Sequence, residues 1–568
     1  MRVNLIFPPY IAPSCVPIGI AYLKSYVERN LKNIYVKTLD LNLEFVDDIV
    51  DGKICRLIGK DEIECVNEEI LCETAKEIIK NRKLFYNKDL IVDYVAPFFS
   101  IMMEYSNHFN SILKLYIEGK IRFDENPIFE YLKEKVKRIL DDNPILIGFS
   151  TLADSQVNFS ISLAKLVKRE SDIPVVLGGP AYFNFDLQTL MECFDFIDFI
   201  IVKEGEKALL ELVKKIIEKD DDYSNVPNLV WRRKGKVVFN QESMIEDLDT
   251  LPTPDYSDLE LKNYYFPELV LPVSSARNCP WKLCKFCELN AQYGPKYRKR
   301  SIDKVIEDLK SLKERYNASN FLITDSEVTS SRLKELSQAI IDSGLKIYFG
   351  CYARPTKSLS LDVLKVAYKS GCRFLMLGVE SLSDRYLKFS RKGTTRESII
   401  EVIKNSYKSG IKLLCYMLCG IPTHTREELL SDMKEIADLQ KRYKIFSVVY
   451  CLFCLGKHQE FYREKEKYKI EVIRKTPVFS PVNSKEIYLE SWLEYRYPDR
   501  GAYDILKDDD SMPELTSLSE AYEKLMKMTE KFELNGSQKN RAFLSTINNF
   551  LFETQLLYAK YSENVEVD

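Results

Sequence analysis

The stretch at residues 274–293 reads SSARNCPWKLCKFCELNAQY and places Cys279, Cys284 and Cys287 within nine residues of one another. Three closely spaced thiolates can hold three irons of a [4Fe–4S] cube and leave the fourth iron free to chelate another molecule. The apolar run at 269–273 predicts a strand that leads into this loop. Trp281 and Phe286 stand between the cysteines, where aromatic rings would shield a cluster from water. The stretch therefore predicts an iron–sulfur site.

Two other interpretations of the three cysteines are open: a structural zinc site, or unrelated cysteines of a core. Structural zinc takes four ligands of the cysteine and histidine type. No cysteine or histidine occurs from Glu288 through Gly350. The iron–sulfur interpretation is therefore favoured.

The composition is typical of a large globular protein. With 568 residues the chain is long enough for two to four domains, and 45% hydrophobic residues support large cores. A formal net charge of −3 gives no footprint of nucleic-acid binding. No apolar run approaches the ~20 residues of a membrane span, and the N-terminus starts on a strand pattern instead of a signal peptide. Fourteen cysteines without a secretion signal predict reduced thiols in the cytoplasm, not a disulfide framework.

Strand and helix patterns alternate through residues 1–240. The expected strands are 3–7, 34–41, 145–150, 175–180 and 196–206, and the expected helices are 18–30, 156–169 and 207–219. This alternation predicts an α/β domain with a doubly wound, Rossmann-like parallel sheet, whose ligands bind beyond the carboxyl ends of the strands. A helical insertion at 44–142 interrupts the pattern, with helices expected at 66–80 and 101–118. A hairpin around Lys234 and Gly235 leads into a linker at 241–267.

Residues 268–460 repeat the alternation. Strands are expected at 321–325, 346–353, 374–381, 413–422 and 446–453, with helices between them. Together with the strand before the cysteines, these predict a partial (β/α)6 barrel. Such barrels place their chemistry at the carboxyl ends of the strands.

The cysteine-rich loop resembles the cluster loop of the radical SAM superfamily, which reads C-x3-C-x2-C with an aromatic residue before the last cysteine. Phe286 fits that position, whereas the first gap here is four residues. The resemblance implies that the three cysteines bind a [4Fe–4S] cluster and that the barrel binds S-adenosylmethionine (SAM). The implied SAM contacts are Asp325, Ser326 and Glu327, where the family has Gly-Gly-Glu, then Arg354, Glu380 and Ser381 in GVES, and Gly420 and Pro422 in a GxP turn. The run RKGTT at 391–395 also fits the family.

Small and polar residues come directly after the strands of the N-terminal domain. They are Pro8, Asp40, Ser150, Thr151, Gly178, Gly179, Glu204 and Gly205. The order of PPY, GFS, LGGP and EGE is similar to the cobalamin-binding domain fused to many radical SAM enzymes, which implies that these residues contact cobalamin. The family's D-x-H-x-x-G pattern is absent, so no histidine is expected to coordinate cobalt. The alternative is a sheet that has lost the cofactor and only packs or binds substrate.

Several cysteines stand outside the loop. Cys55, Cys65 and Cys72 in the insertion match no metal motif and are expected to be ordinary thiols. Two close pairs come later, Cys415 with Cys419 and Cys451 with Cys454. A C-x2-C pair within a strand points to opposite faces, which disfavours a second cluster, and Cys419 and Cys451 are the candidates for a substrate-facing catalytic role. Residues 461–568 are expected to form a mostly helical cap, with helices at 517–531 and 543–561.

The resemblance implies a cobalamin-dependent radical SAM enzyme and favours a C-methyltransferase that modifies an unactivated carbon. One alternative keeps both cofactors and performs cyclisation, ring rearrangement or carbon–carbon coupling. Another is a non-catalytic cobalamin or iron–sulfur sensor. The expected partners are a small-molecule, lipid or peptide substrate and an electron donor such as flavodoxin or ferredoxin, without nucleic acid or a transmembrane segment.

Overall fold

The computed structural model describes residues 1–123, 126–475, 477–482, 484–507, 512, 514–532, 556, 557 and 560. The chain forms two compact units. The first unit contains Met1–Leu269 and Pro477–Leu489, and the second starts at Val270 and contains most of the remaining residues. The division after Leu269 lies next to the expected start of the barrel at 268.

The first unit is built on a seven-stranded sheet of order β2-β1-β3-β4-β5-β6-β7. Its strands are β1 (Arg2–Phe7), β2 (Tyr35–Asp40), β3 (Leu146–Ser150), β4 (Val175–Gly178), β5 (Phe199–Ile201), β6 (Leu229–Arg233) and β7 (Lys236–Phe239). The first five run parallel. Helices α1 (Ile18–Asn30), α8 (Val157–Glu170), α9 (Leu187–Cys193) and α10 (Glu206–Glu218) connect or follow them. The predicted doubly wound sheet is confirmed.

The hairpin at Lys234 and Gly235 has a larger role than the sequence suggested. Both residues have positive φ angles, 49° and 77°, as a tight hairpin turn requires. Strand β6 pairs antiparallel with β5, so the hairpin extends the main sheet. Buried Tyr256, Tyr264 and Tyr265 then bind the linker at 241–267 into the first unit. A linker prediction missed this because aromatic residues among prolines carry no periodic signal.

The insertion is helical, as predicted. Its helices are α2 (Leu41–Val50), α3 (Lys53–Leu57), α4 (Glu62–Lys80), α5 (Lys88–Leu90), α6 (Ala96–Ile117) and α7 (Ile128–Leu140), with a π-helical turn at Ile91–Val95. Phe45, Phe109 and Phe159 pack ring to ring at 5.1–5.7 Å and join the insertion to α8.

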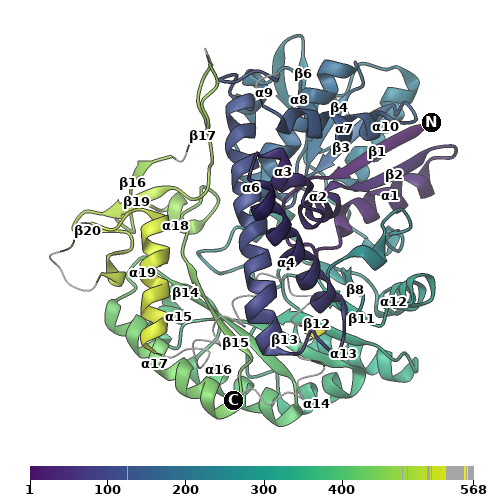
Figure 1. Cartoon of the computed structure of the whole chain (residues 1–568). Coiled ribbons are helices and arrows are strands. Elements are labelled where there is room, and N and C mark those ends of the chain that lie inside the picture. Colours follow the sequence, from purple (N-terminus) through teal and green to yellow (C-terminus); the bar gives the residue numbers. More distant parts are fainter. Residues whose placement is uncertain are drawn as a thin grey trace. The chain divides into compact units, whose positions relative to one another are not determined.

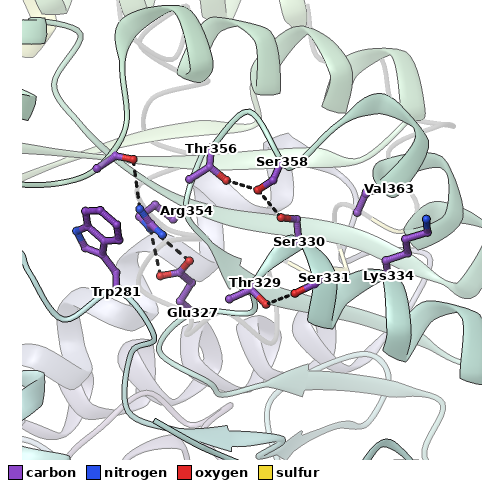
Figure 2. Close-up of a pocket in the computed structure, with 11 residues that line it drawn as sticks. Trp281, Glu327, Thr329, Ser330, Ser331, Lys334, Arg354, Thr356, Ser358 and Val363 are labelled. Atoms are coloured by element: carbon purple, nitrogen blue, oxygen red, sulfur yellow. Dashed lines mark hydrogen bonds and ion pairs between the residues drawn. The ribbon is translucent and has the colours of Figure 1, made fainter. Parts of the chain in front are cut away.

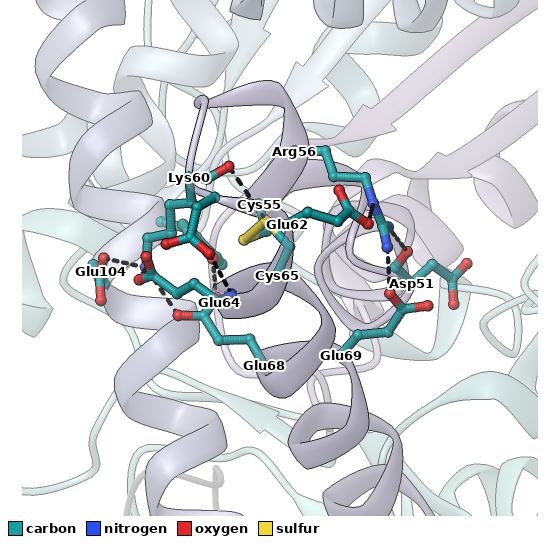
Figure 3. Close-up of a disulfide and its surroundings, with 12 residues drawn as sticks. Asp51, Cys55, Arg56, Lys60, Glu62, Glu64, Cys65, Glu68, Glu69 and Glu104 are labelled. Atoms are coloured by element: carbon teal, nitrogen blue, oxygen red, sulfur yellow. Dashed lines mark hydrogen bonds and ion pairs between the residues drawn. A yellow bond between two sulfur atoms is a disulfide. The ribbon is translucent and has the colours of Figure 1, made fainter.

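The insertion also corrects the expectation of free thiols. Cys55 on α3 and Cys65 on α4 form a disulfide, with their Cα atoms 5.5 Å apart (Figure 3). Cys72, the third cysteine of the insertion, is a free thiol as expected. No sequence pattern marked the bond, because only the reversal of the chain between α3 and α4 brings two residues ten positions apart together. Both bonded cysteines are buried, and charged side chains surround the turn (Figure 3).

The second unit contains a six-stranded parallel sheet of order β15-β14-β13-β12-β11-β8, so each strand pairs with the next along the chain. The strands are β8 (Val270–Val273), β11 (Asn320–Ile323), β12 (Tyr348–Ala353), β13 (Cys372–Glu380), β14 (Lys412–Cys419) and β15 (Ser447–Leu452). Helices α12 (Ile302–Tyr316), α13 (Ser330–Asp342), α14 (Leu361–Ser370), α15 (Asp384–Phe389), α16 (Arg396–Ser409) and α17 (Arg426–Tyr443) separate them (Figure 1). The predicted partial barrel is confirmed.

The C-terminal region differs from the expected helical cap. Its described part contains β16 (Glu471–Arg474), β17 (Pro477–Phe479), β18 (Ile487–Tyr488), β19 (Glu494–Tyr497) and β20 (Arg500–Gly501), beside α18 (Glu460–Arg463) and α19 (Leu518–Lys531). Alternation in EVIR and EYRY is a strand period that a charge-rich composition concealed. The helix expected at 517–531 is present, whereas most of 543–561 lies outside the described residues. Among the described helices, none has the length and apolarity needed to span a bilayer.

Candidate active site around the cysteine loop

The cysteine loop (residues 278–288) lies between two short antiparallel strands, β9 (Ala276–Arg277) and β10 (Arg298–Lys299), just beyond β8. Asn278 and Lys282 turn its backbone with positive φ angles of 70° and 63°, a conformation that Asn tolerates better than most residues. The amide of Cys279 donates to Asn278 Oδ1 at 2.7 Å. The loop is thus shaped by its own backbone before any ligand binds.

Burial and neighbouring charges set the pKa values of the three thiols. Burial raises the pKa of Cys284 to about 12 and that of Cys287 to about 11. Cys279 raises the pKa of both other thiols, so the three groups lie within electrostatic reach of one another. The positive charge of Lys392 acts in the opposite direction on the pKa of Cys284 and of Cys287. The ammonium group of Lys392 therefore favours the thiolate form of these cysteines, which is the form that binds iron.

No group of three or more His, Cys, Asp or Glu side chains in the described part of the chain is arranged to hold a single metal ion. An iron–sulfur cube places different demands on its ligands, because each thiolate binds a separate iron. The donor set of three cysteines on one loop, with aromatic Trp281 and Phe286 between them, fits such a cluster. It does not fit a four-ligand structural zinc site.

The segment 390–393 supports the cysteine loop from the connection between α15 and α16. The amide of Lys285 donates to the carbonyl of Ser390 at 3.1 Å, and Trp281 Nε1 donates to the carbonyl of Arg391 at 2.7 Å. Gly393 has a φ of 72°, and a Cβ there would overlap the Trp281 indole. The motif RKGTT therefore needs its glycine because the indole lies directly against the backbone.

Glu327 and Arg354 form one wall beside the loop. Cys279 Sγ donates to Glu327 Oε2 at 3.4 Å, and Arg354 Nε lies 3.3 Å from both carboxylate oxygens. The Arg354 guanidinium stacks over Trp281 at 4.2 Å, as Figure 2 shows, and donates to the carbonyl of Gly393 at 3.3 Å. Of the predicted SAM contacts, Glu327 thus touches Cys279 directly, and Arg354 is linked to Cys279 through Glu327.

A pocket of about 570 Å³ opens at this wall (Figure 2). Its volume lies in the range typical of small-molecule sites. Hydroxyl groups succeed one another along it, with Ser330 Oγ donating to Ser358 Oγ at 2.6 Å and Thr356 Oγ1 lying 2.8 Å from the same oxygen. The lining residues are Trp281, Glu327, Thr329, Ser330, Ser331, Lys334, Arg354, Thr356, Ser358, Val363 and Gly393. The lining thus combines these hydroxyls with one carboxylate, Glu327, and two cationic side chains, Lys334 and Arg354.

Glu380 and Lys392 form a second charged pair, and both charges influence the pKa of Cys284. Glu380 has a φ of 66°, and the pairing of β13 with β14 shifts at this point from Gly378↔Tyr416 to Glu380↔Met417. Such a bulge redirects a side chain at a strand end. Lys392 Nζ donates to Glu380 Oε1 at 2.8 Å. Burial lowers the pKa of Lys392, but the charges of Glu380 and Cys284 outweigh it and raise that pKa overall.

Two other predicted SAM contacts, Asp325 and Ser381, make hydrogen bonds to other parts of the protein. Asp325 is 1% exposed and accepts the amides of Ser275 and Ala276 at 2.7 and 2.8 Å, and burial raises its pKa to about 6. It fixes the turn from β8 into the loop. Ser381 is fully buried and donates to Asp432 on α17. These two residues shape the site through their internal hydrogen bonds instead of facing a ligand.

The remaining SAM candidates lie at the ends of β11 and β14. Ser326 follows Asp325 and is half-buried. Gly420 has a φ of 91°, and its amide donates to Nδ1 of His424 at 3.1 Å. Pro422 is buried in the same turn. Their SAM contacts remain predictions.

The two substrate-facing candidates separate onto opposite faces of the sheet. Cys419 is 1% exposed, and Asp432 of α17 contributes to the rise in its pKa, after burial and Cys451. Cys419 shares its face of β14 with buried Cys415 and Met417, opposite the half-buried Tyr416 and Leu418, which argues against the predicted substrate-facing role of Cys419. Cys451 pairs in register with Leu418, the neighbour of Cys419, and lies on the inner face.

Lys392 and Tyr297 belong to the site but were not singled out from the sequence. The Tyr297 hydroxyl is buried without a hydrogen-bond partner in the described structure. Burial raises the pKa of Tyr297 to about 12. The nearby Asp325, Glu327 and Cys279 contribute to this rise. Lys392 lies in the RKGTT run that resembles the family, so the sequence contained a signal for it. No motif around Tyr297 indicated that it belongs to the site.

In the first unit, the predicted cobalamin contacts gather at one edge of the sheet, because they come directly after parallel strands. Register pairs Phe7 with Asp40 and Ser150 with Gly178. Asp40 caps α2 by accepting the Leu43 amide at 3.0 Å, and burial raises its pKa to about 7. These strand ends therefore lie at one edge of the sheet, and the Asp40 side chain caps α2 there.

Two further contacts at this edge are internal. A Cβ at Gly179 would overlap the backbone of Thr151, so the β3 and β4 loops pack together closely. Glu204 Oε2 accepts the amide of Ile245 at 2.8 Å. Pro8 and Gly205 also lie at this edge, and His108 lies on α6. Cobalamin binding by these residues remains a prediction.

Comparison with known proteins agrees with the cysteine-loop geometry. Residues 273–436 match the model of the radical SAM superfamily. The chain is 29% identical over 311 residues to an uncharacterized methyltransferase from Pyrococcus horikoshii, covering 54% of this chain and 67% of that protein. It is 28% identical over 322 residues to an anaerobic magnesium-protoporphyrin IX monomethyl ester cyclase from Rubrivivax gelatinosus, covering 54% and 56%. The chain thus spans about half to two thirds of these relatives.

The fold is shared with the solved structure of OxsB, a cobalamin-dependent SAM radical enzyme with aqua-cobalamin and SAM bound. The TM-score is 0.60 at 15% identity, covering 100% of this chain and 80% of OxsB. Residues 273–436 are therefore similar to radical SAM domains, and the fold of the described chain is similar to that of OxsB. The fold expected from the sequence is confirmed, and the family match falls on the segment expected to form the barrel.

Proposed function

We propose that the protein is a cobalamin-dependent radical SAM enzyme and that it transfers a methyl group to an unactivated carbon. The observation that carries the proposal is the three-cysteine loop flanked by two charged pairs, Glu327–Arg354 and Glu380–Lys392. A bound cluster supplies the electron that splits SAM into methionine and a deoxyadenosyl radical, and cobalamin supplies the methyl group. The protein's own task is binding, orientation and exclusion of water.

Each charged pair suits one end of SAM. Glu327 can accept hydrogen bonds from the SAM amino group, and Arg354 beside it can bind a carboxylate. Glu380 can accept from both ribose hydroxyls, because an ionised carboxylate has only acceptor sites. Lys392 holds that carboxylate in place and balances the negative charge that a thiolate-bound cluster brings. These roles fit the positions that the family resemblance implied for Glu327 and Glu380.

The cobalamin half of the proposal is supported by the fold shared with OxsB. The methyl half is supported by the methyltransferase name of the Pyrococcus relative. The relative named as a cyclase favours one second candidate, ring formation with the same two cofactors. Product mass separates them, because methylation adds one CH₂ and cyclisation removes two hydrogens. We further propose that flavodoxin or ferredoxin supplies the electron.

The test is anaerobic reconstitution of the full chain with iron, sulfide and hydroxocobalamin, followed by dithionite and SAM. We expect about one cobalt to stay bound per chain and 5′-deoxyadenosine to form. Deoxyadenosine without bound cobalt would refute the cobalamin half alone. Cobalt without deoxyadenosine would refute the enzyme and leave the sensor interpretation.

A further inference from the structure

The inner face of the barrel carries a row of oxidisable side chains that the cofactor sites do not use. Exposure alternates along residues 415–419 of β14 and 448–451 of β15: Tyr416, Leu418, Val449 and Cys451 are half-buried, whereas Cys415, Met417, Cys419, Val448 and Tyr450 are buried. Residues that alternate along a strand lie on opposite faces. The half-buried set therefore shares one face, and register confirms it by pairing Tyr416 with Val449 and Leu418 with Cys451.

Two tyrosines continue this row across β13. The rings of Tyr352 and Tyr416 stack at 6.3 Å with an interplanar angle of 21°. Tyr352 pairs with Met376 on one side of β13, and Tyr416 pairs with Gly378 on the other side. The face thus presents a thiol and two phenols, which are the side chains of this wall that lose a hydrogen atom most readily.

Register also sets the height of Cys451 relative to Glu380, the residue proposed to hold the SAM ribose. Glu380 pairs with Met417, and Met417 pairs with Tyr450. Cys451 is therefore one residue nearer the carboxyl end of the sheet than the level of Glu380. Barrels of this type perform their chemistry at that end. A Cβ at Gly378, which pairs with Tyr416 of the inner face, would lie 2.8 Å from Glu380 Oε1, so the Glu380 carboxylate lies over that same face.

We propose that Cys451 is a hydrogen-atom donor to the deoxyadenosyl radical, in a wall completed by Tyr416 and Tyr352. This inference rests on the proposed function. An S–H bond is weaker than the C–H bond that forms at the 5′ carbon, so the transfer is downhill. The hydrogen on sulfur exchanges with water, whereas hydrogens of an unactivated substrate carbon do not. The donor consequently brings solvent hydrogen into 5′-deoxyadenosine whenever substrate is missing.

The step balances in two stages. The radical takes a hydrogen atom from the Cys451 thiol, which forms the 5′ C–H bond and leaves a thiyl radical on sulfur. One electron from the reductant, dithionite in the assay, and one proton from water then restore the thiol. The thiol has its proton available at neutral pH, since burial raises the pKa of Cys451 to about 11.

The experiment is SAM cleavage in D₂O by the reconstituted full chain without substrate, with the mass of 5′-deoxyadenosine as readout. We expect one deuterium in the product of the unaltered protein and an at least tenfold lower labelled fraction for Cys451→Ala and Cys451→Ser. Cys419→Ala is the matched control, because that thiol lies on the opposite, buried face of β14, and it should keep the label. Tyr416→Phe should also keep it, which excludes the neighbouring phenol as source.

Unlabelled deoxyadenosine from the unaltered protein, or equal labelling in Cys451→Ala, would overturn the donor role and leave the proposed function intact. Formation of no deoxyadenosine at all would overturn both. A second readout needs no cofactor: in the apoprotein N-ethylmaleimide should modify Cys451 faster than Cys419, identified by peptide mass. Equal protection of the two thiols would contradict the assignment of Cys451 to the open inner face.

Discussion

At the scale of single residues, charged side chains beside the cysteines fix one another's position through hydrogen bonds and ion pairs. Glu327 contacts both Cys279 and Arg354, so it is oriented before a ligand arrives. Glu327→Gln keeps the shape and removes the charge. We expect the Kd for SAM, measured by equilibrium dialysis on the reconstituted protein, to rise by about 10- to 100-fold, the effect of losing one charge-assisted contact.

Glu335→Gln is the control for this variant. Glu335 is an exposed residue of α13 that does not line the pocket. Its substitution should leave the Kd for SAM unchanged. An unchanged Kd in Glu327→Gln as well would contradict the assignment of Glu327 to the SAM amino group.

His424 makes stability depend on pH. It is 2% exposed, and burial lowers its pKa to about 4 from an ordinary 6.5. The unfolded chain therefore binds the proton first, so the contribution of His424 to stability is present above pH 6.5 and is lost as pH falls toward 4. Its full size is about 3 kcal/mol. His424→Asn keeps an acceptor for the Gly420 amide and removes the titration.

The measurement is the free energy of unfolding by urea at pH 7 and at pH 4.5 for both proteins. The unaltered protein should lose more stability on acidification than His424→Asn does. Asp325 and Asp432, whose pKa values are both raised to about 6 mainly by burial, titrate in the same window in both proteins and cancel. Equal losses would show that His424 is not buried in its neutral form.

At the scale of elements, the segment 390–393 serves as the support of the cysteine loop. Gly393→Ala must both adopt a φ of 72° and displace the Trp281 indole. We expect a loss of unfolding free energy of about 1–3 kcal/mol from overpacking and a lower iron content after reconstitution. Gly344→Ala, with a φ of 66° and open space around its Cβ, isolates the conformational cost. An iron content as low in that control would contradict the supporting role.

The disulfide between α3 and α4 is a second feature of the elements that is expected to stabilise the fold. Joining residues ten positions apart restricts the unfolded chain, and such a loop is expected to contribute about 2–3 kcal/mol. The double variant Cys55→Ala/Cys65→Ala should lower the urea midpoint accordingly. A reductant should lower the midpoint of the unaltered protein and leave that of the double variant unchanged. Two free thiols at these positions in the unreduced, unfolded protein, counted by alkylation and mass, would refute the bond.

At the scale of the whole molecule, the sequence predicted both parallel sheets because strand and helix periods alternate over long stretches. It predicted the cysteine loop because three ligands lie within nine residues. Features made by contacts distant in the chain were missed: the Cys55–Cys65 bond, the return of Pro477–Leu489 to the first unit, and the hairpin β6–β7 as part of the main sheet.

The predicted site residues divide in the same way. Glu327, Arg354 and Glu380 come at or just after strand ends, where Glu327 contacts Cys279, Arg354 contacts Glu327, and Glu380 bonds Lys392. Asp325 and Ser381 come at strand ends too, but they are consumed by hydrogen bonds to other elements. Only the packing decides which polar residue at a strand end remains available, and a single sequence does not contain that information.

The most direct test of the central claim is the electron paramagnetic resonance spectrum of the reconstituted, dithionite-reduced protein with and without SAM. If Cys279, Cys284 and Cys287 hold a [4Fe–4S] cluster with one open iron, SAM must shift its g-values, because SAM then binds that iron directly. Cys284→Ala should lose the signal and Cys454→Ala should keep it. A cluster signal that SAM does not perturb, or one that survives in Cys284→Ala, would contradict the account.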